Sequence, residues 1–134
     1  MKRLFLLFLL LITAACQSKP VTGEVVPVAD GSYQDVSVNE LAAMLKNKDF
    51  VFINVHIPFA GDIAQTDLSI PYDEIEQDLS QFPTDKNVKI VLYCRSGRMS
   101  QIAAEKLVSL GYTNIWNLKG GMVEWEQAGY PLAK

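Results

Sequence analysis

The sequence contains few of the residues that build metal and nucleotide sites. Its 134 residues include two cysteines and one histidine, which cannot form the Cys/His cluster of a zinc site. It also has no glycine-rich fingerprint for nucleotide phosphates. Acidic residues outnumber basic ones, 15 to 12, which argues against nucleic acid as a partner. We therefore expect a protein without a metal or a cofactor.

Long hydrophobic runs are also scarce. The apolar run from Leu4 to Ile12 is too short to cross a bilayer, since a spanning helix needs roughly 20 apolar residues. Basic residues precede this run, and the small residues Thr13, Ala14 and Ala15 follow it. This order predicts an export signal over residues 1–15.

The segment "ITAAC" followed by "QSK" resembles a bacterial lipoprotein signal. The resemblance implies cleavage before Cys16, lipid attachment to Cys16, and a membrane-anchored protein in the cell envelope that faces outside the cytoplasm. Gln17 favours the periplasmic side of the outer membrane, if the cell has one. Ordinary secretion with a free Cys16 is the alternative, because Thr13 stands where such signals most often have leucine.

The rest of the chain divides into a linker and one domain. Residues 16–33 mix Pro, Gly and Ser with short polar residues, which predicts a flexible tether. Residues 34–134 carry the folding signals. Apolar runs at 50–55, 88–93 and 114–118 predict buried strands, and an extra edge strand is expected near residues 33–37.

Helices are expected between these strands. Ser37 and Glu40 form the pattern of a capping box, as do Asp73 and Glu76, so helices are predicted at 37–49 and 72–82. Further helices are predicted from Ser100 to Gly111 and over 120–129. Strands that alternate with helices predict an α/β sandwich of three layers, with a mostly parallel central sheet of about five strands flanked by helices.

Cys94 stands where the second predicted strand ends and a loop opens the next helix. Ligands of parallel α/β sheets bind at this edge, and unpaired amides at a helix start attract anions. The same field favours the thiolate form of cysteine. We expect Cys94 to be a catalytic nucleophile and the following loop to bind the substrate, with the residues Arg95, Ser96, Gly97, Arg98 and Met99.

Two simpler interpretations remain open. Cys94 could be a small buried hydrophobic residue at a strand end, which is the common fate of a free cysteine. Arg95 and Arg98 could be solvated surface charges. However, if Cys16 carries lipid, Cys94 has no partner for a disulfide, and an unpaired thiol in an oxidising compartment needs a reason.

The motif "YCRSGRMS" and the closing segment "LGYTNIWNLKGGMVEWEQAGYPL" resemble the rhodanese family of sulfurtransferases over about residues 34–133. The resemblance implies a rhodanese-like fold and a persulfide on Cys94. The chain departs from the family at three places. Asn54 and His56 replace Asp and Arg, "GDIAQTD" replaces a "GHIPGA" turn, and Met99 replaces a loop arginine. His56 is either a base for Cys94 or a hydrogen-bonded structural residue.

The resemblance implies transfer of sulfane sulfur from thiosulfate, a polysulfide or a persulfide to a thiol or cyanide. The implied partners are a small anionic donor and a thiol acceptor. A non-enzymatic sulfur carrier or sensor is the alternative. A phosphatase or arsenate reductase is less favoured, because those enzymes commonly need an arginine six residues after the cysteine, where this chain has Ser100.

Overall fold

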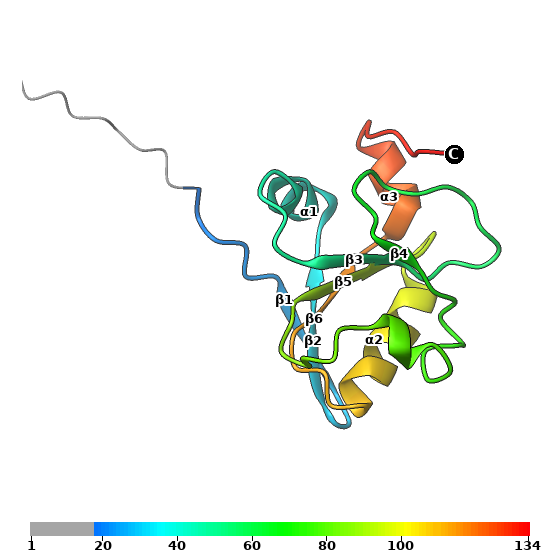
Figure 1. Cartoon of the computed structure of the whole chain (residues 1–134). Coiled ribbons are helices and arrows are strands. Elements are labelled where there is room, and N and C mark those ends of the chain that lie inside the picture. The colour runs from blue at the N-terminus through cyan, green and yellow to red at the C-terminus, as the bar shows by residue number, and fades with distance from the viewer. Residues whose placement is uncertain (1–17) are drawn as a thin grey trace, which may run out of the picture.

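The computed structural model describes residues 18–134 (Figure 1). Six strands form one sheet in the order β1-β2-β6-β5-β3-β4. Their bounds are Glu24–Val28 for β1, Gly31–Val36 for β2, Val51–Asn54 for β3, Leu68–Ser69 for β4, Ile90–Tyr93 for β5 and Ile115–Leu118 for β6. β1 and β2 are antiparallel and all other pairs are parallel, so the prediction of a mostly parallel sheet is confirmed.

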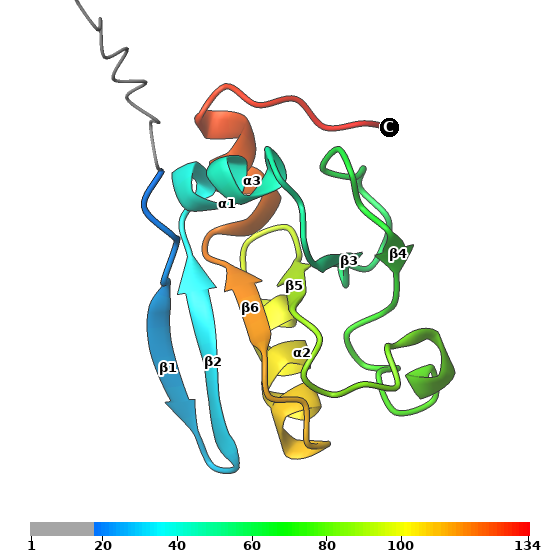
Figure 2. The ribbon, with the colours of Figure 1, turned by 60° about the vertical axis from the view of Figure 1, so that its left-hand side comes forward.

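Helices cover both faces of this sheet, as Figure 2 shows. Helices α1 (Val38–Leu45) and α3 (Gly121–Gln127) lie on one face, and α2 (Arg98–Ser109) lies on the other. β5 separates the two hydrophobic clusters by simple alternation: Ile90, Leu92 and Cys94 face α2, whereas Val91 and Tyr93 face α1 and α3. The predicted three-layer α/β sandwich is therefore confirmed, and Cys94 belongs to the α2 side.

Local signals placed most elements correctly. The capping box of α1 is present, because the Ser37 side chain accepts a hydrogen bond from the Glu40 amide and the Glu40 carboxylate accepts one from the Ser37 amide. The predicted strands correspond to β3, β5 and β6. The strand expected near residues 33–37 corresponds to the end of β2, but its predicted edge position is wrong, because β2 lies between β1 and β6. Two predicted helices correspond to α2 and α3.

The prediction of a flexible tether over residues 16–33 is wrong from residue 24 onward. β1 and the start of β2 form a hairpin there, in which Val28 pairs with Gly31 across a tight turn. The two turn residues are Ala29 and Asp30, and Gly31 takes the last turn position, where glycine is favoured. Val26 and Val28 pack against the hydrophobic cluster under α2. The signal peptide predicted for residues 1–15 and the lipid site Cys16 lie outside the described residues.

The helix predicted over residues 72–82 is also wrong. The segment consists of turns followed by one short 3-10 helix, η1 (Leu79–Gln81). Glu74 and Asp78 stand four residues apart, where like charges destabilise a helix. The predicted apolar anchors are nevertheless in place, because Ile75 and Phe82 are buried and each stabilises the fold by about 1.5–3 kcal/mol.

Within residues 18–134, no helix has the length and apolar character that a membrane crossing requires. The same part of the chain has no group of His, Cys, Asp or Glu side chains that could hold a metal ion.

Candidate active site

The loop after β5 is built around the sulfur of Cys94. Cys94 is the first residue beyond the strand, and its side chain is only 1% exposed. The amide of Gly97 donates a hydrogen bond to its Sγ atom at 3.0 Å. The hydroxyl of Ser100 lies 3.4 Å from the same sulfur and also donates to the Gly97 carbonyl at 3.0 Å. The sulfur thus lies in a polar cradle, although its surroundings are buried.

Gly97 gives the loop its shape. Its φ of 104° lies in the left-handed region, which side chains other than glycine rarely adopt. It is the N-cap residue of α2 and has no side chain to cap the helix. The first amides of a helix have no partner inside the helix, so the positive end of α2 starts next to the sulfur. The start of α2 therefore places backbone N–H donors beside the sulfur.

The start of α3 holds the cysteine loop from the other side. The amides of Met122 and Val123 donate to the carbonyls of Cys94 and Arg95, both at 2.9 Å. Gly121 permits this approach, since a β-carbon at its position would lie 2.7 Å from the Arg95 carbonyl oxygen and closer still to that of Cys94. The turn of Lys119, Gly120 and Gly121 therefore supports the cysteine loop.

The remaining predicted loop residues differ in exposure. Arg95, Ser96 and Arg98 are exposed, and Met99 is half-buried against the cluster under α2. Within residues 18–134, neither Arg95 nor Arg98 forms an ion pair. Both guanidinium groups are thus available to a small anion at the mouth of the loop. Exposure alone would also fit solvated surface charges, so their role rests on the proximity of Cys94.

Ser100 is the site residue that sequence reasoning missed. In the sequence, Ser100 stood out only as the position where a phosphatase commonly needs an arginine. Its side chain is fully buried at the first turn of α2 and touches the sulfur of Cys94. A small polar residue six positions after the cysteine, in the first turn of a helix, was the available signal, because that turn faces back toward the strand end.

His56 lies close to the site but is not bonded to the sulfur. The donors to Cys94 Sγ are Gly97 and Ser100. The Nδ1 atom of His56 is buried and has no partner among the described residues. Burial, and then the nearby Arg95 charge, lower the pKa of His56 below its usual value, so the ring is neutral at pH 7. Among the described residues, the His56 ring thus forms neither a hydrogen bond to Cys94 nor a structural hydrogen bond.

Asn54 replaces the family's aspartate in a different network. Its side-chain amide donates to the Gly61 carbonyl at 3.0 Å and to the Asp62 carboxylate at 2.9 Å, and its oxygen accepts from the His56 amide. The Tyr93 hydroxyl donates to the same carboxylate at 3.1 Å. The residue before the cysteine is therefore tied to the loop after β3.

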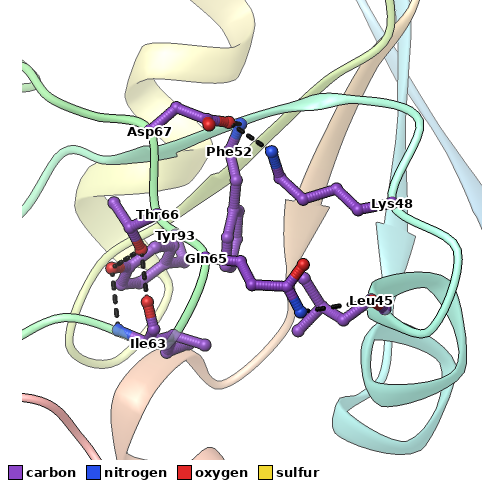
Figure 3. Close-up of polar contacts among 8 residues, drawn as sticks. All are labelled: Leu45, Lys48, Phe52, Ile63, Gln65, Thr66, Asp67 and Tyr93. Atoms are coloured by element: carbon purple, nitrogen blue, oxygen red, sulfur yellow. Dashed lines mark hydrogen bonds and ion pairs between the residues drawn. The ribbon is translucent and has the colours of Figure 1, made fainter.

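Figure 3 shows how that loop is fastened. The Ile63 amide donates to the Tyr93 hydroxyl at 3.0 Å, and Thr66 lies 2.7 Å from the same oxygen. Asp67 accepts from the Phe52 amide at 2.8 Å and from Lys48 at 2.6 Å. Burial raises the pKa of Tyr93 well above its usual value, so it is a neutral hydroxyl. Neutral and ionic hydrogen bonds thus fix the loop after β3, where this chain lacks the family's "GHIPGA" turn.

Comparisons with known proteins agree with this geometry. The sequence model of the rhodanese-like domain matches residues 37–128. A sulfurtransferase of Allochromatium vinosum is 34% identical over 89 residues, which cover 63% of this chain and 79% of that protein. A tRNA uridine(34) hydroxylase of Erwinia tasmaniensis is 29% identical over 78% of this chain, but the match spans only 31% of the hydroxylase.

A solved structure carries the same fold. The crystal structure of a rhodanese-related protein from Thermoplasma volcanium superimposes with a TM-score of 0.64 and 29% sequence identity, covering 75% of this chain and 98% of that one. The residues that the family model matches include β5, the cysteine loop and α2. The chain therefore belongs to the family of rhodanese-like domains, whose sulfurtransferase members it resembles at the cysteine loop.

Proposed function

We propose that this protein is a sulfurtransferase that carries sulfane sulfur as a persulfide on Cys94. The observation that supports this most directly is the Gly97 amide, which points at the Cys94 sulfur from 3.0 Å at the start of α2. A buried sulfur that accepts hydrogen bonds from an amide and a hydroxyl differs from a cysteine that only fills a core. The sulfurtransferase name of the Allochromatium relative agrees with this reading.

The first half-reaction loads the sulfur. The Cys94 thiolate attacks the outer sulfur of thiosulfate, a polysulfide or a persulfide and forms a new S–S bond. The bond between the two donor atoms breaks, and its electron pair leaves with sulfite when the donor is thiosulfate. The exposed guanidinium groups of Arg95 and Arg98 would hold the anionic donor. The positive end of α2 would stabilise the charge that then rests on the outer sulfur.

The second half-reaction releases it. A thiol in the cell, or cyanide in an assay, attacks the outer sulfur of the persulfide. The S–S bond breaks, and its electron pair returns to Cys94, which becomes a thiolate again. Ser100 and the Gly97 amide are placed to receive that returning charge, because both already donate to this atom. Cyanide attacks without losing a proton, whereas a thiol acceptor attacks as its thiolate, after its proton has passed to solvent.

The assay that tests this proposal is thiosulfate:cyanide sulfur transfer. Cys94→Ser should abolish turnover while its melting temperature stays close to that of the wild type, and equal rates would refute the proposal. Arg95→Gln and Arg98→Gln should each raise KM for thiosulfate about fivefold, as the loss of roughly 1 kcal/mol at an exposed charge implies. Lys106→Gln on α2 is the matched charge control.

Two other functions make different predictions. A sulfur carrier or sensor would accept one sulfur atom per chain without cycling, so single-turnover and steady-state measurements separate it from a catalyst. A phosphatase would hydrolyse aryl phosphates through Cys94. The geometry speaks against the phosphatase, since Ser100 occupies the position of its arginine and fills the space beside the sulfur.

We also propose that residues 1–15 are removed, that Cys16 carries lipid, and that the domain faces outside the cytoplasm. The basic start, the short apolar run and the segment "ITAAC" support this placement. Metabolic labelling with a palmitate analogue tests it. The wild-type chain should take up label and Cys16→Ser should not, whereas equal labelling would contradict the proposal.

A further inference from the structure

A basic hollow lies far from the cysteine loop. It has a volume of about 320 Å³ and is bordered by Ser18–Val21, by the end of α1 and by the residues that precede β3 and β5. Three of its lining residues are the lysines Lys19, Lys46 and Lys89, whereas Asp49 supplies the single carboxylate. The hollow thus carries the opposite sign to the chain, whose net charge is −3.

Two of these lysines are available to a ligand. Lys89 is partly neutralised, because its Nζ atom lies 3.6 Å from the Asp49 carboxylate and 4.8 Å from the centre of the Trp116 ring. Lys19 and Lys46 are exposed, and within residues 18–134 neither of them forms an ion pair. Anionic groups that approach this surface therefore meet two uncompensated positive charges.

Apolar side chains also line the hollow. Val21 and Met44 line it and pack against the hydrophobic cluster of α1 and α3. Lysines beside apolar side chains suit the boundary between phospholipid headgroups and acyl chains. At this boundary a lysine buries the methylenes of its side chain and keeps its ammonium group near phosphate. A soluble anion would gain nothing from Val21 and Met44.

The hollow and Cys94 lie at opposite ends of the parallel strands. Lys89 immediately precedes β5 and Cys94 immediately follows it, which separates them by roughly 17 Å along the strand. In Figure 1, residues 18–23 lie at the left of the molecule, while β3 and β5 point to the right. A surface that covers the hollow would therefore leave the cysteine loop free.

The segment from Ser18 to Gly23 lies close against the domain. Val21 is packed against the domain, and Gly23 is held so closely between Trp116 and the Asp35 carbonyl that a β-carbon would crowd both. Cys16 precedes Ser18 by only two residues in the sequence. The inference therefore rests on the proposed lipid at Cys16, which would hold a membrane against this side of the domain.

We propose that the basic hollow rests on anionic phospholipid headgroups and orients the domain, with the cysteine loop directed away from the membrane. The inference does not depend on sulfur transfer at Cys94. Each uncompensated lysine should favour the docked orientation about fivefold, the equivalent of about 1 kcal/mol per lysine at an anionic surface. Docking should weaken as salt is added, because exposed charges are screened.

Lysine acetylation tests the proposal on the chain as the cell processes it, purified from membranes. The protein is reconstituted in vesicles of phosphatidylcholine alone or mixed with phosphatidylglycerol, and each lysine is followed by mass spectrometry. Lys19 and Lys46 should be modified at least threefold more slowly in the anionic vesicles, and salt should remove the difference. Lys106 and Lys134 should react at the same rate in both.

Two variants keep the test decisive. Lys19→Gln/Lys46→Gln should abolish the protection of Lys89 by anionic vesicles, whereas Lys106→Gln/Lys134→Gln, with the same loss of charge, should retain it. Equal acetylation of Lys19 and Lys46 in the two kinds of vesicle would overturn the proposal. It would also fail if the control lysines were protected as strongly, since the membrane would then show no preferred face.

Discussion

Ser100 provides the sharpest test of how the site works. Ser100→Ala removes the hydroxyl that lies 3.4 Å from the Cys94 sulfur and leaves the Gly97 amide in place. A hydrogen bond to a charged group contributes about 1.5–3 kcal/mol, but this one is long and shared with the Gly97 carbonyl, so we expect about 1 kcal/mol. That value corresponds to roughly fivefold in rate.

Both half-reactions should slow. Loss of the hydroxyl removes a donor that orients the sulfur for loading, and it also weakens the stabilisation of the charge that returns to Cys94 on discharge. The fold should survive, since the Gly97 carbonyl still accepts from the Gln101 amide at 3.1 Å. We expect the free energy of unfolding to fall by less than about 1 kcal/mol.

Rapid-mixing kinetics separates the two steps. Loading is followed as sulfite release and discharge as thiocyanate formation, each in a single turnover. Ser109→Ala is the matched control, because this hydroxyl lies on the same helix and donates to a backbone carbonyl far from the sulfur. Wild-type rates in Ser100→Ala, or equal slowing in Ser109→Ala, would refute the assigned role of the hydroxyl.

Three further predictions concern the supports of the site. Gly121→Ala should lower sulfur transfer at least tenfold and destabilise the fold by more than Gly129→Ala does. Both glycines have positive φ, but only Gly121 contacts the cysteine loop. Equal urea midpoints and equal rates for the two variants would contradict this. Burial tends to raise the pKa of Asp67, but its hydrogen bonds from Lys48 and Phe52 outweigh burial and lower it. Its stabilisation should therefore be complete above its ordinary pKa of 3.8 and be lost as pH falls through the lower folded value. Thermal melts should show Asp67→Asn about 1 kcal/mol less stable at pH 7 and equal to wild type in strong acid; a constant difference would count against the pairing. The lowered pKa of His56 should cost stability as pH falls below 6.5, and His56→Gln should remove that part of the melting curve's pH dependence; an unchanged pH profile would be inconsistent with a half-buried neutral ring.

The sequence predicted the parts of the fold that local patterns determine. Continuous apolar runs identified β3, β5 and β6, and the position of Cys94 after such a run placed it at the edge of the sheet where ligands bind. The short helix predicted at 72–82 failed because Ile75 and Phe82 are buried equally well by turns. Burial of anchors does not specify the backbone between them when the helix is short and its charges repel.

The parts of the site that the sequence did not reveal depend on contacts between distant segments. The carbonyls of Cys94 and Arg95 are held by amides of α3, more than twenty residues away in the chain, and no local pattern encodes that pairing. The exchange of the family's ion pair for Asn54 was visible as a departure, but its new partner Asp62 was not. Ser100 is visible in the sequence, but its contact with the Cys94 sulfur depends on where α2 begins.

The central claim is that the Cys94 sulfur accepts and holds a second sulfur atom. Intact-protein mass spectrometry after treatment with thiosulfate, followed by cyanide, measures this directly. The account predicts that the wild-type chain gains the mass of one sulfur atom, that cyanide removes it, and that Cys94→Ser gains nothing. A wild-type chain that stays unmodified, or a Cys94→Ser chain that gains the same mass, would contradict it.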